Sequence, residues 1–432
     1  MSARPPRTVT VEALARVEGE AGFSVKIRKG EVIAAALNVF EPPRFFEALL
    51  RGRAFTEAPD LTARICGICP VAYQMSAVHA MESLCEVTVG GALRDLRRLL
   101  YCGEWIESHA LHVAMLHAPD FLGYESALHL AKDRPDVVTD ALRLKKAGND
   151  LVTLVGGREI HPVSVKVGGF WKTPSREALR AFTPRMEDAR ERALGLLKLV
   201  SGFSFPDFDR DLPLVALRHP DEYPMNEGRI VSTSGLDLAV AEYERAFFEE
   251  HLPRSNALHS GMTGRGPYLV GPLARYSLNF DRLSPLAQEA AREAGLSESC
   301  RNPFRSIVVR AVETVYACDE ALRLIARYEP PAQPAVAVSP RAGTGCAATE
   351  APRGLLYHRY RIDGAGIIRN AKIVPPTSQN LKAIEKDLSL FARAHLGLDT
   401  KSLTLRLEQV VRNYDPCISC ATHLLTIDRD DR

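Results

Sequence analysis

The sequence has no apolar run near the roughly 20 residues that a helix needs to cross a bilayer. Its first residues, MSARPPRTVTVEALARVEG, lack the apolar stretch of a signal peptide, so we expect a cytoplasmic protein with no direct membrane insertion. Net charge is also nearly absent, because 55 Lys and Arg face 53 Asp and Glu, which leaves a formal charge of +2. So small an excess offers no basic field to nucleic acid or anionic lipid, and we exclude both as default partners.

Internal repeats and low-complexity tracts are absent as well, and the composition is that of an ordinary folded protein, 46% hydrophobic and 25% charged. These values exclude disorder, collagen and a disulfide miniprotein. At about 150 residues per domain, a chain of 432 residues suggests roughly two or three domains, or one large composite core.

Nine cysteines, an odd number, argue against a fully paired disulfide framework. Four of them form two Cys-x-x-Cys pairs, Cys66 with Cys69 and Cys417 with Cys420. Such a turn brings two sulfurs to one side of the backbone, and two turns can supply four thiolates to a soft or borderline metal. The pattern therefore favours a reducing compartment and a metal site.

The two pairs are separated by 347 residues, whereas the pairs of a structural zinc site usually lie about 15 to 20 residues apart. The first and last parts of the fold would have to meet around the metal. Spacing alone leaves three interpretations open: structural zinc, four unrelated buried or redox cysteines, and a transition-metal redox centre. His423, three residues after Cys420, is either a further ligand or a polar residue near the chain end.

Hydrophobic periodicity predicts a small N-terminal sheet and a mainly helical middle. Residues 8–40 alternate like two or three strands, with a turn at Arg28-Lys29-Gly30. The expected helices cover residues 44–50, 75–84, 93–116, 175–200, 380–396 and 403–414. We also expect a loop or short hairpin at 156–171, surface excursions at 205–224 and 328–340, and a β segment at 358–376. The predicted fold class is α+β, mainly α, with a central helical bundle and small β regions near the N-terminus and in the C-terminal third.

The residues around the two cysteine pairs are highly specific. Arg64-Ile65-Cys66-Gly67-Ile68-Cys69 and Asp415-Pro416-Cys417-Ile418-Ser419-Cys420-Ala421-Thr422-His423 resemble the two signatures of nickel-iron hydrogenase large subunits. The resemblance extends through Arg16-Val17-Glu18-Gly19, Glu104 to Gly123, Gly157 to Gly169 and Glu350-Ala351-Pro352-Arg353-Gly354. It therefore covers essentially the whole chain.

The resemblance implies a nickel-iron centre with carbonyl and cyanide ligands on iron. Cys66 and Cys417 would be terminal nickel ligands, and Cys69 and Cys420 would bridge nickel to iron. The activity that it implies is reversible heterolytic cleavage of dihydrogen to protons and electrons, with Cys417 passing a proton to a carboxylate. Glu18 matches the family's proton-gate glutamate, although by itself it would be interpreted as an exposed strand residue.

Arg353 corresponds to the family's arginine above the metals, where a guanidinium can polarise dihydrogen and hydrogen-bond a cyanide. Asp415 would hold Arg353 by a charge-assisted pair. Without the other motifs, Arg353 would be a surface loop cation and Asp415 a helix-ending turn before Pro416. Glu47 and His423 align with the family's magnesium ligands, and Glu47 is otherwise the polar position of an amphipathic turn.

Two departures from the family pattern concern hydrogen bonds around the metals. Tyr73 stands where the family commonly has a histidine that hydrogen-bonds a bridging thiolate, and a phenol can still donate one hydrogen bond. A hydroxyl near a cyanide would have to come from Thr377. We expect no metal at His109, His112 and His117, which would line the region of the site. The other cysteines are interpreted as ordinary buried residues: Cys85, Cys102, Cys300, Cys318 and Cys346.

Nine residues follow His423. In the family, a maturation endopeptidase usually removes a C-terminal extension after this histidine once nickel is loaded, so the chain is either a precursor or a branch that keeps a short tail. We expect one composite domain over residues 1–432. Its parts would be an N-terminal β region and first helix (1–60), a helical bundle with surface excursions (61–340), a C-terminal β/α region closing the metal site (341–423) and a removable tail (424–432).

No further cysteine cluster looks like an iron-sulfur site in this chain, so electrons would require an iron-sulfur small subunit. The compact length resembles the cytoplasmic NAD(P)-linked, sulfhydrogenase alpha-subunit type, as do Cys-Gly-Ile-Cys-Pro and Val-Pro-Pro-Thr. That type implies diaphorase-type NAD(P)/flavin and electron-transfer subunits, with NAD(P) bound only by these partners. The alternatives are a deazaflavin-reducing or membrane-bound energy-converting large subunit and, more distantly, a non-catalytic zinc-stapled scaffold or a complex I-type subunit, which lacks the four cysteines.

Overall fold

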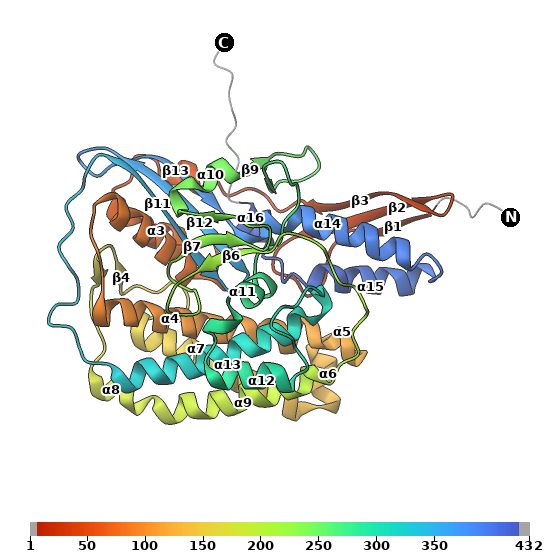
Figure 1. Ribbon diagram of the computed structural model, residues 1–432, viewed down its shortest axis with the longest axis horizontal. Coiled ribbons are helices and arrows are strands. Elements are labelled where there is room, and N and C mark those ends of the chain that lie inside the picture. Colours follow the sequence, from red (N-terminus) through yellow and green to blue (C-terminus); the bar gives the residue numbers. More distant parts are fainter. Residues whose placement is uncertain (1–6, 423–432) are drawn as a thin grey trace, which may run out of the picture.

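The computed structural model of the protein describes residues 7–422. His423 and residues 424–432, to which the sequence assigns a magnesium ligand and a removable tail, lie outside the described residues. Figure 1 shows a layer of long helices below a layer that holds small sheets and further helices. No helix within residues 7–422 has the length and apolar character needed to span a membrane.

The N-terminal sheet contains three antiparallel strands, which confirms the predicted β region. They are β1 (Arg7–Val11), β2 (Ala21–Arg28) and β3 (Glu31–Val39), in the order β1-β2-β3. The predicted turn joins β2 to β3, and both Lys29 (φ 52°) and Gly30 (φ 78°) adopt left-handed backbone angles there. Alternate residues of β2 are buried, as expected of a sheet with one covered face.

Four long helices form the lower layer and confirm the predicted bundle: α4 (Gly91–Ala110), α7 (Pro135–Gly156), α9 (Thr183–Ser201) and α13 (Ser306–Arg327). Two glycines let α4 and α7 approach closely, because a Cβ on Gly148 would lie 2.6 Å from the carbonyl oxygen of Gly103. Helix α13 packs against both α4 and α9, and most of its residues are buried. The shorter helices are α1 (Phe46–Leu50), α2 (Ala58–Ala63), α5 (Ala118–Leu122), α6 (Ala127–Asp133), α8 (Arg176–Ala181), α10 (Tyr243–Ala246), α11 (Pro272–Asn279) and α12 (Pro285–Glu293).

Two predicted helices are subdivided in the structure. The segment 93–116 is α-helical only to Ala110 and continues as a π-helix over Leu111–His117. The segment 175–200 contains α8 and then α9, because Pro184 occupies the first turn of α9. A proline has no N–H to give to a preceding turn, so it begins a helix more readily than it continues one.

The C-terminal sheet is built from β11 (Gly343–Ala351), β12 (Gly354–Ile362) and β13 (Ile368–Val374), all antiparallel. The sequence predicts β12 and β13 but misses β11, whose residues are small and do not alternate in hydrophobicity. Close packing explains this composition: β11 lies against α3 (Pro70–Leu84), and a Cβ on Gly345 would be 2.2 Å from the carbonyl oxygen of Ala80.

The prediction of a surface excursion at 205–224 is wrong in its second half. Leu212, Leu214 and Tyr223 are buried, and β6 (Val215–Arg218) is the first strand of the sheet β6-β7-β8. A strand of four residues is too short to show a period, so the prolines around it dominated the prediction. The excursion at 328–340 is mostly exposed, as predicted. The remaining strands are β4 (Val165–Lys166) and β5 (Gly169–Phe170), which form the expected short hairpin, with β7 (Arg229–Ser232), β8 (Asp237–Leu238), β9 (Phe247–Glu250) and β10 (His259–Met262).

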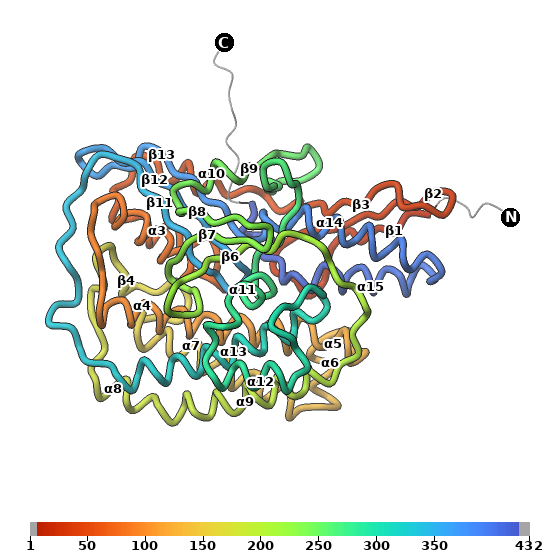
Figure 2. The backbone as a smooth tube through the Cα atoms, in the orientation of Figure 1, coloured from red at the N-terminus to blue at the C-terminus, as the bar shows by residue number. Residues whose placement is uncertain are grey.

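The first and last parts of the chain lie side by side. Figure 2 shows the N-terminal strands, in red, along two blue helices, α14 (Pro376–Ala394) and α15 (Thr400–Arg412). The last described helix, α16 (Ile418–Ala421), packs against α14. This arrangement brings the segment between β1 and β2 and the last described helix to the loop between α2 and α3, which carries the first cysteine pair.

Candidate metal centre

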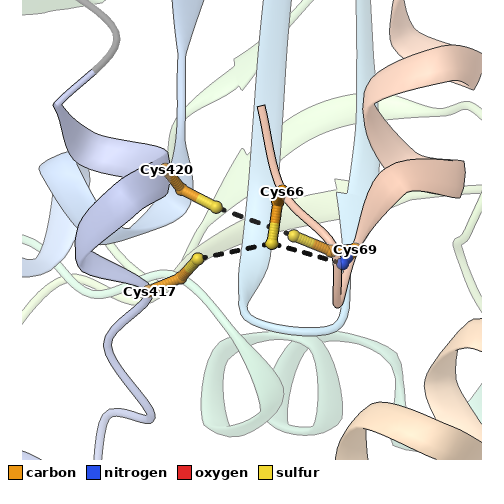
Figure 3. A group of neighbouring side chains, drawn as sticks. All are labelled: Cys66, Cys69, Cys417 and Cys420. Carbon is orange, nitrogen blue, oxygen red and sulfur yellow. Dashed lines mark hydrogen bonds between the residues drawn. The ribbon is translucent and has the colours of Figure 1, made fainter. Parts of the chain in front are cut away.

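The four cysteines of the two pairs form one buried cluster (Figure 3). Cys66 lies in the loop before α3 and Cys69 directly precedes that helix, whereas Cys417 precedes α16 and Cys420 lies within it. The sulfurs of Cys66 and Cys417 are 3.6 Å apart, and those of Cys69 and Cys420 are 3.7 Å apart. All four sulfurs lie within 4.8 Å of one another, although 351 residues separate the members of each close pair.

The first cysteine loop turns its backbone towards one of its own sulfurs. Sγ of Cys66 accepts hydrogen bonds from the backbone N–H of Ile68 at 3.3 Å and of Cys69 at 3.4 Å. These bonds favour the ionised form of the thiol. Hydrogen bonds with the other cysteines, first that with Cys417, lower the pKa of Cys66, whereas burial raises the pKa of Cys417.

The cluster has the chemistry of a site for a thiolate-binding metal. Four thiolates buried this close together repel one another. All four can therefore be ionised at once only if a cation lies between them. Metal ions that prefer sulfur supply that charge. The sulfur separations alone also suit one tetrahedral ion, since a zinc–sulfur bond is about 2.3 Å long. The groups around the sulfurs must therefore be considered.

Glu18 lies against the second cysteine pair. The Cys417 thiol donates to Oε2 of Glu18 at 3.0 Å, and the backbone N–H of Ser419 donates to the same oxygen at 3.1 Å. The carbonyl oxygen of Glu18 accepts from the N–H of Ile418 at 3.0 Å. Gly19 permits this contact, because a Cβ there would lie 2.7 Å from Cβ of Ile418. The half-buried carboxylate thus connects a buried sulfur with the outside.

Arg353 and Asp415 are a buried pair next to the sulfurs. Nη2 of Arg353 donates to Oδ1 of Asp415 at 3.2 Å, and Nε donates to its backbone oxygen at 2.8 Å. Burial works against the charge, but Asp415 and the cysteine sulfurs raise the pKa of Arg353 above its ordinary value. Nη1 of Arg353 has no hydrogen-bond partner within residues 7–422 and suits an acceptor bound at the cluster. Asp415 also forms a turn after α15, with φ 50°. It therefore both pairs with Arg353 and lies in the turn between α15 and Pro416, so the two roles considered from the sequence are compatible.

Thr377 and Tyr73 also lie at the cluster. The hydroxyl of Thr377, in the first turn of α14, accepts a hydrogen bond from the backbone N–H of Cys417 at 3.0 Å. Tyr73 is buried in the first turn of α3, and its ring lies 5.8 Å from that of His358. Burial and the nearby sulfurs of Cys420 and Cys69 raise the pKa of Tyr73 well above its ordinary value. Its phenol therefore stays protonated and able to donate.

Glu47 lies at a separate place, on α1 beside β13. Its Oε1 accepts from the backbone N–H of Ile373 at 2.6 Å, and burial raises the pKa of Glu47 to about 8. A buried carboxylate of this kind suits a cation. His423, its expected partner, lies outside the described residues.

His109, His112 and the remaining cysteines do not belong to this cluster. The four cysteines are the one group of three or more His, Cys, Asp or Glu residues within 7–422 that are placed to hold a metal. His109 contacts Glu313 at 3.0 Å, and His112 contacts the backbone oxygen of Arg412 at 2.8 Å. Cys102, Cys300 and Cys318 are buried as predicted, whereas Cys85 and Cys346 are only partly buried.

Sequence reasoning missed Glu104, which holds the helix that follows the first cysteine pair. Its carboxylate accepts from the backbone N–H of Val71 at 2.6 Å and of Ala72 at 3.2 Å, at the N-terminus of α3. Cys69 occupies the capping position, but its side chain points to the cluster, so a carboxylate from α4 satisfies these donors instead. The quoted segment Glu104 to Gly123 contains the residue, but no spacing rule identifies a cap supplied by another helix.

Comparisons with known proteins agree with this geometry. The family model of nickel-dependent hydrogenases matches residues 44–139 and 266–423. The chain is 32% identical to the alpha subunit of sulfhydrogenase 1 from Pyrococcus furiosus, over 97% of this chain and 98% of that protein. It is 26% identical to the beta subunit of an NAD-reducing hydrogenase from Cupriavidus necator, over 97% of this chain and 95% of that protein.

A solved structure extends the likeness to the whole fold. A chain in the crystal structure of an NAD+-reducing NiFe hydrogenase in the H2-reduced state superimposes with a TM-score of 0.88 and 26% identity. The match covers 96% of this chain and 99% of that chain. The α+β, mainly α fold expected from the sequence is therefore that of hydrogenase large subunits. The chain belongs to the nickel-dependent hydrogenase family, as a large subunit.

Proposed function

We propose that this chain binds a nickel-iron centre through its four clustered cysteines and catalyses the reversible splitting of dihydrogen. The observation that supports this proposal most directly is the contact between the Cys417 thiol and Glu18, at 3.0 Å. A zinc scaffold needs four sulfurs and no acid-base group beside them. A hydrogenase needs a carboxylate that exchanges a proton with a sulfur of the site.

The described residues fit the metal centre of the family. Cys66, Cys69, Cys417 and Cys420 would hold nickel through their sulfurs, together with an iron that carries carbonyl and cyanide ligands. When bound, this centre would supply the site of heterolytic dihydrogen cleavage. Arg353 would offer its unpartnered Nη1 to a ligand or substrate there, in an orientation that Asp415 fixes. Thr377 would hold the backbone of Cys417 and thereby orient its sulfur.

The chain's own residues would move the proton. Sγ of Cys417 would receive it and pass it to Oε2 of Glu18, which the N–H of Ser419 keeps within reach. Glu18 is half-buried, so its carboxylate can release the proton towards solvent. The same path runs backwards when dihydrogen is formed, as microscopic reversibility requires.

Glu47 would hold a magnesium ion together with His423. The buried carboxylate with a pKa near 8 supports a cation at this place.

Electrons would leave through partner subunits. Within residues 7–422 no second group of His, Cys, Asp and Glu residues is placed to hold a metal, so an iron-sulfur small subunit must accept the electrons. Relatives named as subunits of a sulfhydrogenase and of NAD-reducing hydrogenases support NAD(P) as the final acceptor, with diaphorase-type partners in a cytoplasmic complex. A deazaflavin-reducing or energy-converting complex is the alternative, and the subunits that copurify distinguish these types.

Two measurements test the proposal. Metal analysis and infrared spectroscopy of the complex from its native host should show nickel, iron, and carbonyl and cyanide stretches, whereas zinc alone would contradict the metal assignment. Glu18→Gln should keep metals and stretches but lose at least about tenfold in exchange of dihydrogen with solvent deuterons, because general acid-base groups contribute that much or more. Glu20→Gln, in an exposed neighbour, is the matched control. Wild-type exchange in Glu18→Gln would exclude Glu18 as the proton acceptor.

A further inference from the structure

Buried side chains from α4 and α11 hold the backbone of the turn that carries Arg353. Three consecutive carbonyl oxygens precede Arg353, those of Glu350, Ala351 and Pro352. The first accepts from Nε1 of Trp105 at 3.1 Å, and the other two accept from Arg275 at 2.6 and 2.8 Å. Buried side chains thus bind the last two carbonyls of β11 and the first carbonyl of the turn to β12, which fixes the backbone before Arg353.

Arg275 uses all of its hydrogen-bond donors in this arrangement. Nε and Nη2 bind Glu313 at 2.9 and 2.8 Å, Nη1 binds Glu350 at 3.0 Å, and the two remaining N–H groups bind the turn. The guanidinium also lies over the ring of Trp105, 4.3 Å from its centre. Five donors in one plane are a property of arginine that lysine lacks.

The helix that carries Arg275 begins directly against the same turn. Gly271 precedes α11, and a Cβ there would lie 2.7 Å from the carbonyl oxygen of Arg353. A Cβ on Gly354 would lie 2.7 Å from the backbone nitrogen of Gly271. Both glycines have positive φ angles, 115° and 136°. Backbone contact without side chains leaves the turn little freedom to shift.

Charge balance alone does not account for this geometry. Against the effect of burial, the charge of Arg275 lowers the pKa of Glu313 to about 2, so this pair is satisfied as an ion pair. The bonds from Arg275 to the oxygens of Ala351 and Pro352 add nothing to the neutralisation. They fix the backbone immediately before Arg353, whose side chain then binds Asp415 and lies near enough to the sulfurs for their charges to raise its pKa.

We propose that Arg275, supported by Trp105, is a positioning residue that sets the place of the Arg353 guanidinium above the cysteine cluster. This inference rests on the role proposed for Arg353. Arg275 acts through its bonds to the turn 350–353 rather than on a cysteine directly. Misplacement of a catalytic group by about 1 Å can cost about a hundredfold in rate, so the turn is a sensitive point.

The test is a double-mutant cycle in the purified complex with Arg275→Lys and Arg353→Lys. Arg275→Lys keeps the charge beside Glu313 but loses the five-donor pattern, and we expect turnover to fall about 10- to 100-fold with nickel and iron retained. Because Arg275 acts through Arg353, the double variant should be within about threefold of Arg353→Lys alone. The infrared stretches should shift in the same direction in both single variants.

Arg98→Lys is the matched control. Arg98 is equally buried and binds Glu320 and Tyr316, but it has no contact with the turn. Arg98→Lys should lose little activity, and in the double variant this loss should multiply with that of Arg353→Lys. The infrared stretches of Arg98→Lys should be those of the wild type. Trp105→Phe removes one hydrogen bond to Glu350 and keeps a ring beneath Arg275, so it serves the same cycle if Arg275→Lys does not fold.

The outcomes separate this inference from the proposed function. Wild-type turnover in Arg353→Lys would overturn the role of Arg353 and this inference with it. A strong loss in Arg353→Lys together with wild-type turnover in Arg275→Lys would overturn the positioning role alone. Multiplying losses, or loss of nickel from Arg275→Lys but not from Arg98→Lys, would show a general structural role and would equally overturn it.

Discussion

Glu18 and Cys417, 399 positions apart in the sequence, contact each other through both their side chains and their backbones. The Cys417 thiol donates to the carboxylate of Glu18 at 3.0 Å, and the backbones of the two residues form a parallel bridge. The side-chain contact therefore does not depend on the rotamer of a long glutamate alone. The backbone pairing holds an acid-base group at one sulfur of the four.

The first prediction concerns the cysteines as metal ligands. Cys66→Ser should reduce bound nickel to background, because a hydroxyl is a poor ligand for a thiophilic metal in a site built of sulfur. Metal analysis of the purified complex measures this. Cys318→Ser changes an equally buried cysteine on α13 and should retain nickel. Full nickel in the Cys66 variant would remove Cys66 from the ligand set.

The second prediction concerns Tyr73, which replaces the usual histidine. Because its phenol is protonated and lies near Cys420, we expect it to donate to that sulfur when the metals are bound, and Tyr73→Phe should then shift the infrared stretches of the iron ligands. Tyr73→His should restore a donor. Tyr101→Phe, in a buried tyrosine of α4 that lies among Thr349 and Glu104 rather than sulfurs, should leave the spectrum unchanged. Identical spectra for wild type and Tyr73→Phe would refute the hydrogen bond.

The third prediction concerns stability and pH at Glu107 on α4. Burial raises the pKa of Glu107 from 4.5 to about 7, against the charge of Lys145 at 3.0 Å. The folded chain therefore keeps a proton that the unfolded chain releases near pH 4.5. The resulting stabilisation is fully present below that pH and is lost as pH rises through about 7, a change of roughly 3 kcal/mol.

Thermal denaturation from about pH 5 to 8 measures this effect. Glu107→Gln should make the decline of the melting temperature shallower than in the wild type, whereas Glu125→Gln, in an exposed residue, should not. An unchanged decline in Glu107→Gln would show that another group is responsible.

The fourth prediction concerns the cation at Glu47. Its buried carboxylate has a pKa near 8, so ionisation at neutral pH costs stability unless a cation is bound. Removal of divalent ions with a chelator should lower the melting temperature of the wild type by a few degrees. Glu47→Gln should melt at the same temperature with and without the chelator. An equal response of the two proteins would place the cation elsewhere.

Much of the site could be predicted from the sequence because its four cysteines stand in two recognisable Cys-x-x-Cys pairs. Cys66, Cys69, Cys417 and Cys420 stand in short patterns whose chemistry is specific, and the structure brings their sulfurs together. Glu18 and Arg353 were found only through the motifs around them. A glutamate on a strand and an arginine in a turn look like surface residues until their burial is known.

The residues that hold the site could not be predicted. Glu104 and Arg275 act across elements far apart in the sequence, and no period or local motif marks a partner on another helix. The strand β11 was missed for a related reason, since its small residues follow from the close approach of α3. Local sequence patterns indicate which face of a helix or strand is buried, but they do not indicate which residues of another element pack against that face.

The long separation within the cluster sets the order in which a new chain acquires its ligands. Cys66 leaves the ribosome 351 residues before Cys417, a delay of roughly 20 to 70 s at ordinary rates of synthesis. During that time the first thiols have no partners, and the helical layer can fold around an open site. Closing so large a loop costs little more than closing a shorter one, because each doubling of length adds only about 0.6 kcal/mol. Distance along the chain thus delays the complete set of four thiols until Cys417 and Cys420 have been made, at a modest thermodynamic cost.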